Sequence, residues 1–279
     1  MIDKQHARRA FSRAAGSYDE AAVLQREVGQ RMLERLDYMR VQPRMILDIG
    51  AGTGEASASL LKRYPKASVI ALDFALPMLQ RARGRGRVLR RPLPLCADLE
   101  QLPLAAHSVD MIYSNAALQW CSDLASTFTE FRRVLRPGGL LLFSSFGPDT
   151  LKELRSAWEQ VDGRRHVNNF VDMHDVGDLL VEAQFAEPVM DAERITMTYQ
   201  SVDQLMRDIK RIGAHNTDAG RSKKLTGKQR MQQFRDAYEL FRCDGRLPST
   251  WEVVYGHAWA PRQVTEDGVT TVSVDALRA

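Results

Sequence analysis

From residue 44 to residue 147 the chain alternates short apolar runs with segments of helical periodicity, and no other feature restricts its fold as strongly. The apolar runs read MILDIG, SVIALDF, VLRRPLPLCAD, VDMIYSN and LLLFSSFG, and the helical segments between them read EASASLLKRY, ALPMLQRAR and DLASTFTEFRRVL. Apolar strands that alternate with helices form a mainly parallel sheet covered on both faces. We therefore predict an α/β, Rossmann-like fold.

Helical periodicity also marks both flanks of this region. Residues 3–39 contain two amphipathic stretches, and the break at Gly16 predicts two helices with Tyr18 at their joint. Further along, the capping-box patterns TLKE from Thr150 and SVDQ from Ser201 predict the starts of two more helices. Other helices are expected over 172–185 and 228–241, and strands over 188–199 and 251–261.

These patterns divide the chain into consecutive parts without any internal repeat or low-complexity linker. The predicted parts are an N-terminal helical lid over 1–43, an α/β core over 44–200, a helical insertion over 201–247, the final strand of the core over 248–263, and a tail over 264–279.

The sequence LDIGAGTGE, at the end of the first apolar run, has the form of a nucleotide-binding turn. Gly50 and Gly52 fit a dinucleotide motif, but the third glycine position of that motif holds Glu55. An acid at Asp48 would repel a pyrophosphate and would suit a ligand with an ammonium or sulfonium charge. S-Adenosylmethionine carries both positive groups and no phosphate, and glycines let the backbone approach it closely. A tight turn without a ligand is the alternative interpretation.

Polar side chains follow the next three predicted strands where those strands end. Asp73 follows the second strand, where a carboxylate can accept both hydroxyls of a ribose. Asp98 follows the third, suited to the adenine amino group, and Asn115 follows the fourth, between cofactor and substrate. Each acid alone is weak support, because aspartates often cap helices in such loops. The predicted cofactor contacts are Phe11, Tyr18, Asp48, Gly50, Ala51, Gly52, Asp73, Phe74, Met78, Asp98, Leu99 and Asn115.

Residues 44–147 resemble the class I S-adenosylmethionine-dependent methyltransferases. The glycine motif of that family matches LDIGAGTGE, and its acidic second motif matches Asp73. The resemblance implies a mostly parallel seven-stranded sheet, an N-terminal helical lid and a helical insertion before the last strand. It also implies S-adenosyl-L-methionine as cofactor and S-adenosyl-L-homocysteine as product. No metal is expected, because the six histidines show no spacing typical of metal ligands.

The flanks are similar to a narrower family, the methyltransferases of early biotin synthesis that methylate the free carboxyl of malonyl-acyl carrier protein. The matching stretches are AFSRAAGSYDEAAVLQREV, SNAALQWCSDL, LKELRSAWEQVDGRRHVNNF and MRDIKRIGAHN. The similarity implies an O-methyltransferase whose acceptor is the malonyl group of an acyl carrier protein or of coenzyme A. Its product would be a malonyl methyl ester that primes pimeloyl synthesis for biotin.

Methylation of a malonyl carboxylate, which is ionised at neutral pH, needs no general base, and none is evident. A covered, dry pocket is expected instead. Phe11 and Tyr18 would close over the cofactor, with the Tyr18 hydroxyl bonding a carboxylate; simple packing of an amphipathic helix is the alternative. Arg207 and Lys210, three residues apart on one predicted helix, would steer the malonyl carboxylate, unless they are a solvated surface pair. Further candidates for acceptor contacts are His166, Asn168 and His215.

The formal net charge of +4 and the pI near 9.0 favour an acidic partner such as a carrier protein, without demanding nucleic acid. Basic residues near the insertion are candidates for its docking surface, namely Arg221, Lys223, Lys224 and Lys228. No apolar run approaches the roughly 18 residues that span a membrane, and the three cysteines are dispersed. We therefore expect a cytoplasmic protein without a membrane partner.

Two other functions remain open at this point. One is a small-molecule methyltransferase that acts on a free carboxylic acid or a quinone precursor. The other is a cofactor-binding or RNA-binding module without catalysis, which the arginine-rich segment RARGRGRVLRR at 81–91 motivates. A solvated loop is the simpler interpretation of this segment, because no aromatic residues interleave with its arginines.

Overall fold

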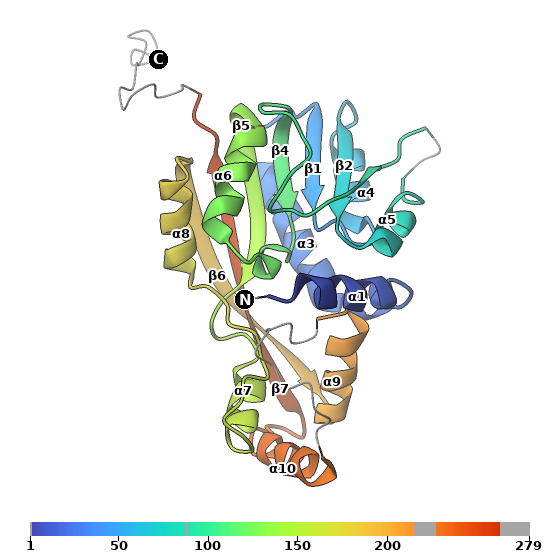
Figure 1. Cartoon of the computed structure of the whole chain (residues 1–279), viewed down its shortest axis with the longest axis vertical. Coiled ribbons are helices and arrows are strands. Elements are labelled where there is room, and N and C mark those ends of the chain that lie inside the picture. Colours follow the sequence, from blue (N-terminus) through green and yellow to red (C-terminus); the bar gives the residue numbers. More distant parts are fainter. Residues whose placement is uncertain (1, 87–88, 215–226, 263–279) are drawn as a thin grey trace.

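The computed structural model describes residues 2–86, 89–214 and 227–262, and its centre is a seven-stranded sheet (Figure 1). The strands are β1 (Met45–Ile49), β2 (Ser68–Asp73), β3 (Leu93–Cys96), β4 (Val109–Ser114), β5 (Leu135–Phe146), β6 (Ala186–Tyr199) and β7 (Leu247–Trp259). They follow the order β3-β2-β1-β4-β5-β7-β6 across the sheet. The first five pair in parallel, and β7 pairs antiparallel with both β5 and β6. The predicted mostly parallel, seven-stranded sheet is confirmed.

Helices cover both faces of the sheet. They include α3 (Val23–Arg35), α4 (Glu55–Arg63), α5 (Leu76–Ala82), α6 (Leu124–Val134) and α8 (Met173–Glu182), with short 3-10 turns η1 (Leu36–Tyr38) and η2 (Leu118–Trp120). Ile46 and Leu47 are neighbours in β1, so their side chains point to opposite faces. Ile46 belongs to a core cluster with Leu60 of α4, and Leu47 belongs to a second cluster with Phe128 of α6 and Leu180 of α8. No helix in the described ranges is both long and apolar enough to cross a membrane.

The N-terminal segment forms α1 (Lys4–Ala14), the single turn α2 (Tyr18–Ala21) and then α3. The predicted break at Gly16, with Tyr18 at the joint, is confirmed. A second break at Ala22, whose φ is −79° and ψ is 46°, gives three helices where two were predicted. In Figure 1, α1 lies across the lower ends of the parallel strands, which are their carboxyl ends.

β6 and β7, of 14 and 13 residues, continue well beyond the carboxyl ends of the parallel strands. The helices α7 (Lys152–Glu159), α9 (Val202–Arg211) and α10 (Lys228–Glu239) surround this extension (Figure 1). α9 and α10 lie within the predicted insertion at 201–247, whereas α7 comes from the range 44–200. Three helices from two parts of the chain therefore form the lower half of the molecule.

The two capping-box predictions have different outcomes. α9 begins as predicted, because the Ser201 side chain accepts a hydrogen bond from the Gln204 N–H. α7 begins at Lys152 without a side-chain cap, and the Thr150 hydroxyl instead donates to the Glu252 carbonyl of β7. The prediction of a capping box at Thr150 was wrong, because a contact between distant segments replaced the local pattern.

Candidate active site

A glycine-rich turn joins β1 to α4 at the carboxyl edge of the sheet. Gly50, Gly52 and Gly54 have φ of +68°, +54° and +83°, a region in which residues with a Cβ are strained. A Cβ at Gly50 would lie 2.4 Å from the Cβ of Ala117, and one at Gly54 would lie 2.7 Å from Ala82. The turn therefore needs glycine both for its backbone conformation and for close packing against α5 and the loop after β4.

Asp73 is the last residue of β2 and lies beside this turn. Its carboxylate accepts hydrogen bonds from the backbone N–H groups of Gly52 (3.0 Å) and Ala75 (2.8 Å). Burial raises the pKa of Asp73 to about 6, and the backbone hydrogen bonds oppose this shift. The two donors fix the orientation of the carboxylate and leave further lone pairs for a ligand hydroxyl.

Asp48 lies within β1, is 1% exposed, and accepts a hydrogen bond from the Ser57 hydroxyl. Burial raises the pKa of Asp48 to about 7, an effect that the Ser57 hydrogen bond opposes and the nearby charge of Asp73 reinforces. From the sequence alone Asp48 is expected to be ionised, whereas in this environment it is partly protonated at neutral pH. A cation beside it would lower the pKa again and restore the charge.

Two small cavities adjoin the glycine turn. The Asp73 cavity, of about 60 Å³, is lined by Phe11, Asp73, Phe74, Met78, Asp98 and Leu99 among others. The Asp48 cavity, of about 90 Å³, is lined by Gln25, Arg26, Asp48, Ala51 and Tyr113 among others. Both cavities also touch Tyr18, Gly50, Gly52 and Asn115. Every cofactor contact predicted from the sequence therefore lines at least one of them.

Asp98 is engaged by a cation from the N-terminal helix. The Nζ of Lys4 in α1 lies 2.6 Å from Asp98 Oδ2 and also pairs with Glu100. The sequence predicted an adenine amino group at Asp98, and such a group would have to share this carboxylate with Lys4. Sequence reasoning missed Lys4, because 94 residues separate it from Asp98.

Tyr18 in α2 lies where the two small cavities meet a third, larger one. Its ring faces the glycine turn, since a Cβ built on Gly52 would lie 3.8 Å from Tyr18 Cε1. Burial and the charges of Asp73 and Asp19 raise the pKa of Tyr18 well above its ordinary value. Its hydroxyl is therefore a hydrogen-bond donor at neutral pH.

Two other predicted contacts lie near this junction. Phe11 in α1 packs edge-to-face on Trp120, with ring centroids 5.2 Å apart. Asn115, directly after β4, donates to the Gln25 carbonyl (2.8 Å) and accepts from the Ser144 hydroxyl (2.9 Å). Contacts within the chain thus hold Asn115 in place where the two small cavities adjoin each other.

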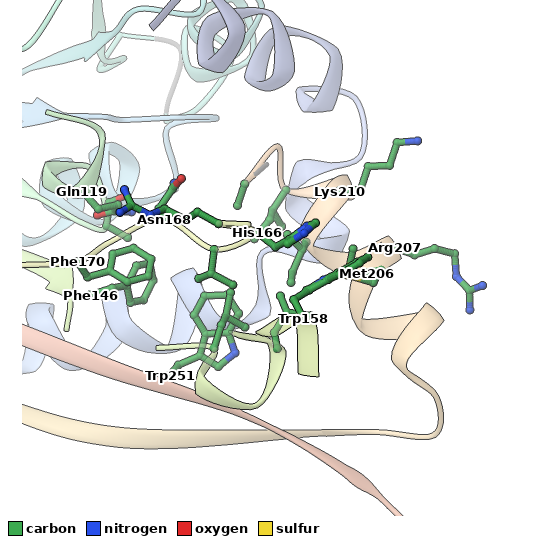
Figure 2. A pocket seen from close by; sticks show the side chains of 18 of the residues that line it. Gln119, Phe146, Trp158, His166, Asn168, Phe170, Met206, Arg207, Lys210 and Trp251 are labelled. Atoms are coloured by element: carbon green, nitrogen blue, oxygen red, sulfur yellow. The ribbon is translucent and has the colours of Figure 1, made fainter. Parts of the chain in front are cut away.

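The third cavity, of about 610 Å³, lies between the carboxyl edge of the sheet and the helices α7 and α9 (Figure 2). We call it the aromatic cavity, because Phe146, Trp158, Phe170 and Trp251 form much of its wall. Its polar and charged lining residues include Gln25, Gln119, Arg164, Arg165, His166, Asn168, Arg207 and Lys210. A large apolar pocket with a few polar groups suits an extended ligand that carries one charged end.

Trp158 in α7 is the centre of a stack of three rings. The His166 ring lies 3.8 Å from it at an interplanar angle of 8°, and the Phe234 ring of α10 lies 4.2 Å from it at 11°. His166 Nε2 also lies 2.7 Å from Asp162 Oδ1. One face of His166 and one of its nitrogens are therefore occupied by the chain, and the loop after α7 is fixed over the cavity.

Arg207 and Lys210 are exposed residues of α9 at the mouth of the aromatic cavity. Figure 2 shows their charged ends pointing away from the aromatic side chains. In this arrangement the positive charges of Arg207 and Lys210 face a negatively charged ligand that approaches from outside. Among the other basic candidates, Lys228 is an exposed residue at the start of α10. His215, Arg221, Lys223 and Lys224 lie outside the described residues.

Comparison with known proteins identifies the family. Residues 47–143 match a family model described as a methyltransferase domain. The malonyl-acyl carrier protein O-methyltransferase of Gallionella capsiferriformans is 54% identical over 98% of this chain and 96% of its own. The enzyme of the same name from Laribacter hongkongensis is 54% identical over 95% of this chain and 94% of its own. The chain belongs to the malonyl-acyl carrier protein O-methyltransferase family.

Solved structures with the same fold are much less similar in sequence than these family members. The YcgJ protein of Bacillus subtilis has a TM-score of 0.58 at 16% identity, covering 82% of this chain and 97% of its own. A phosphoethanolamine N-methyltransferase of Haemonchus contortus, in complex with S-adenosylhomocysteine, has a TM-score of 0.52 at 18% identity, covering 84% of this chain and 52% of its own. These likenesses establish the fold and say nothing about the acceptor.

For this member of the family, sequence reasoning missed several residues of the aromatic cavity. The side-chain oxygens of Gln25 and Gln119 and the indole nitrogen of Trp251 are buried and have no hydrogen-bond partner among the described residues. Such atoms are rare in folded proteins, and contact with a bound ligand or water is one explanation for them. One signal was available, because Gln25 lies next to Leu24, on the apolar side of its helix.

Across the described ranges, no three His, Cys, Asp or Glu side chains are grouped to hold a metal ion.

Proposed function

We propose that this protein transfers the methyl group of S-adenosylmethionine to the free carboxylate of malonyl-acyl carrier protein or malonyl-coenzyme A. One observation carries the proposal: the two acidic cavities at the glycine turn and the aromatic cavity meet at Tyr18. A donor held on one side and an acceptor held on the other would face each other there. The names of the family members support the choice of acceptor.

The residues around the glycine turn fit S-adenosylmethionine. Asp73 would accept the ribose hydroxyls, because two backbone N–H groups already orient its carboxylate. Asp48 would stabilise the positive end of the cofactor, whose charge would return the carboxyl to its ionised form. Phe74, Met78 and Leu99 would contact the adenine, and Asp98 would accept from its amino group. The cofactor supplies an electrophilic methyl group on a sulfonium.

The size of the aromatic cavity favours a thioester over a free acid. A malonyl group has few atoms, whereas the cavity measures about 610 Å³, within the ~300–1,000 Å³ typical of pockets that bury extended ligands. The pantetheine arm that carries a malonyl thioester would occupy the remaining volume, along Trp158 and Trp251. The carboxylate at the end of that arm would then reach Tyr18.

Methyl transfer to a carboxylate requires that the two reacting groups are aligned and that water is excluded, and it needs no proton transfer. A carboxylate oxygen forms a bond to the methyl carbon while the sulfur retains the electron pair of the bond that breaks. The carboxylate is ionised at neutral pH, so no base is needed, and His166 is engaged by Trp158 and Asp162. Alignment of the reacting groups can lower the barrier by ~7–11 kcal/mol in favourable cases. Exclusion of water favours a reaction in which opposite charges partly cancel.

Tyr18, Arg207 and Lys210 are the chain's candidates for handling the carboxylate. The Tyr18 hydroxyl would donate to it at the junction, in the protonated form that burial of this side chain favours. Arg207 and Lys210 would attract the negative acceptor at the cavity mouth. Under this proposal, Tyr18 positions the carboxylate for methyl transfer, and Arg207 and Lys210 help the acceptor to bind.

A nucleic-acid function has less support. In the described part of the 81–91 segment, Arg81, Arg85 and Arg90 all donate to carbonyl groups of this chain. Arginines committed in this way present fewer free donors to a phosphate backbone. A small free acid as acceptor stays the second hypothesis, and it would leave most of the aromatic cavity without a role.

An acceptor panel tests the proposal. The protein would be incubated with S-adenosylmethionine labelled in the methyl group and with malonyl-acyl carrier protein, malonyl-coenzyme A, free malonate, acetyl-acyl carrier protein or succinyl-acyl carrier protein. We expect a base-labile methyl ester on the malonyl thioesters and little label on the other compounds. Label on none of the thioesters would refute the proposal, and preferential label on free malonate would favour the small-acid alternative. The methyl ester would then serve as primer of pimeloyl synthesis for biotin.

A further inference from the structure

The arginine-rich segment is tied to the rest of the chain at several points. Arg81 Nη2 donates to the Gly16 carbonyl at 3.2 Å, and Arg90 Nη2 donates to the Leu61 carbonyl at 3.0 Å. Arg85 bears most directly on the site, because it contacts both Thr53 of the glycine turn and Asp19 of α2. We call α1 and α2, which lie over the cofactor end, the cover. The described part of the arginine-rich segment therefore connects neighbouring parts of the chain at the cofactor end of the molecule.

Asp19 of α2 is held by both of its carboxylate oxygens. Arg85 Nη2 lies 2.6 Å from Asp19 Oδ2, and the Thr53 hydroxyl donates to Asp19 Oδ1. Arg85 Nε also donates to the Thr53 carbonyl at 3.1 Å, which closes a triangle between the three residues. Thr53 is only 3% exposed, so its hydroxyl is a fixed partner. The backbone carbonyl of Asp19 accepts from Arg26, which adds a fourth tie.

Asp19, Thr53 and Arg85 come from three separate segments that meet at the cofactor end of the molecule. Thr53 is part of the glycine turn, Arg85 lies three residues beyond the end of α5, and Asp19 is the neighbour of Tyr18 in α2. The position of Tyr18 over Gly52 therefore depends on where Asp19 is held.

The cover must open to admit a ligand. Phe11 of α1 and Tyr18 of α2 line the cavities in which the cofactor would bind, so these two helices lie over its path of entry. α1 and α2 therefore have to move outward when the cofactor enters. The contacts between α2 and the turn are among those that must break and form again.

We propose that Asp19, Thr53 and Arg85 form a lid clasp that holds α2 over the bound cofactor and so positions Tyr18 for transfer. The side chains of Arg85 and Asp19 are 34% and 37% exposed, so water can reach the ion pair and the clasp can open reversibly. An exposed ion pair alone contributes little, but here hydrogen bonds through buried Thr53 reinforce it. All three are positioning residues, and the clasp depends on the proposed function only in that the ligand is S-adenosylmethionine or its product.

The rate of cofactor release tests the clasp by a double-mutant cycle. A complex with labelled S-adenosylhomocysteine would be chased with excess unlabelled compound for the wild type, Asp19→Ala, Arg85→Met and the double variant. We expect each single substitution to accelerate release roughly 10-fold, since either one opens the clasp. The double variant should release at nearly the same rate as the singles, because the two residues act together. Arg85→Lys, which keeps the charge, should recover part of the wild-type rate.

Arg83→Met is the matched control, because it removes the same charge from the same segment and, within the described ranges, the Arg83 side chain makes no hydrogen bond or ion pair. It should release at the wild-type rate. Additive effects of Asp19→Ala and Arg85→Met, equal effects of Arg83→Met and Arg85→Met, or unchanged release in both singles would overturn the clasp.

A second measurement uses the wild-type protein and removes any dependence on variant folding. Added NaCl screens the Asp19–Arg85 pair, so release should accelerate with salt in the wild type and much less in Arg85→Met. A salt response of equal size in both proteins would contradict the clasp. None of these experiments contains an acceptor, so failure of malonyl-acyl carrier protein as a substrate would not affect their outcome.

Discussion

The two ends of the candidate active site are built in different ways. At the glycine turn, residues from consecutive strand ends meet because parallel strands bring their carboxyl ends to one edge of the sheet. In the aromatic cavity, Trp251 lies on the part of β7 beyond the parallel strands, where it meets Phe146 at the end of β5, and Trp158 comes from α7, which packs on β7. The first end is small, acidic and rigidly framed, and the second is large and aromatic.

The two ends are suited to different ligands. Under the proposed function, the glycine turn holds the cofactor and the aromatic cavity holds the acceptor. The two ends meet at Tyr18, a residue of neither the sheet nor the lower helices. Substitutions should therefore separate into those that weaken the cofactor and those that weaken the acceptor.

The largest effect is expected from Asp73→Ala. Loss of a charged acceptor for two ribose hydroxyls should weaken S-adenosylmethionine binding by roughly 100-fold, because hydrogen bonds to charged groups are among the stronger ones. Calorimetry would measure the change, and a thermal melt would check that the turn, which also bonds Asp73, remains folded. Affinity within twofold of the wild type would remove Asp73 from the cofactor site.

Lowering the pH should weaken cofactor binding through Asp48. The pKa of Asp48 is about 7, so below pH 7 most of the free protein carries a protonated Asp48. The cationic cofactor prefers the ionised form, and its binding must then displace a proton. Affinity should therefore drop about 10-fold between pH 8 and pH 6, with the steepest change below pH 7. Asp48→Asn should bind weakly at every pH, with a flatter profile between pH 8 and pH 6. A wild-type affinity that stays constant over this range would show that Asp48 does not meet the positive charge.

Phe170→Ala should affect the opposite end of the site. Its ring packs against Phe146 at 5.9 Å and is only partly buried, so the fold should tolerate its loss. We expect the KM for the malonyl thioester to rise about fivefold, since less apolar surface contacts the arm, while cofactor affinity stays unchanged. Equal losses of acceptor and cofactor binding would mean that the two ends are not separable.

The smallest effect is expected from the basic pair at the cavity mouth. Arg207→Gln and Lys210→Gln should each raise the KM for malonyl-acyl carrier protein roughly two- to threefold at low salt, because exposed charges act mainly through weak, screened attraction. The difference should shrink as salt is added. Lys62→Gln, an exposed lysine of α4 that does not line the cavity, is the matched control. Identical kinetics for all three variants would leave Arg207 and Lys210 without a role in capture.

The sequence sufficed for the features that depend on short-range pattern. Strand–helix alternation predicts the sheet, and the order of the strands along the chain predicts that Asp48 and Asp73 lie near the glycine turn. Lys4 at Asp98 and the Trp158–Phe234 stack were not predictable, because they join residues far apart in the chain. Thr150 shows the limit of local patterns, since a bond to β7 overrode its capping box. The partial protonation of Asp48 also required knowledge of its burial, which one sequence does not provide.

A crystal structure of the ternary complex would show whether donor and acceptor meet at Tyr18. The protein would be crystallised with S-adenosylhomocysteine and a malonyl-pantetheine amide, whose amide replaces the reactive thioester. We expect the cofactor at Asp48 and Asp73, the arm along Trp158 and Trp251, and the terminal carboxylate beside Tyr18, facing the sulfur. A carboxylate bound away from Tyr18, or an arm outside the aromatic cavity, would contradict this expectation.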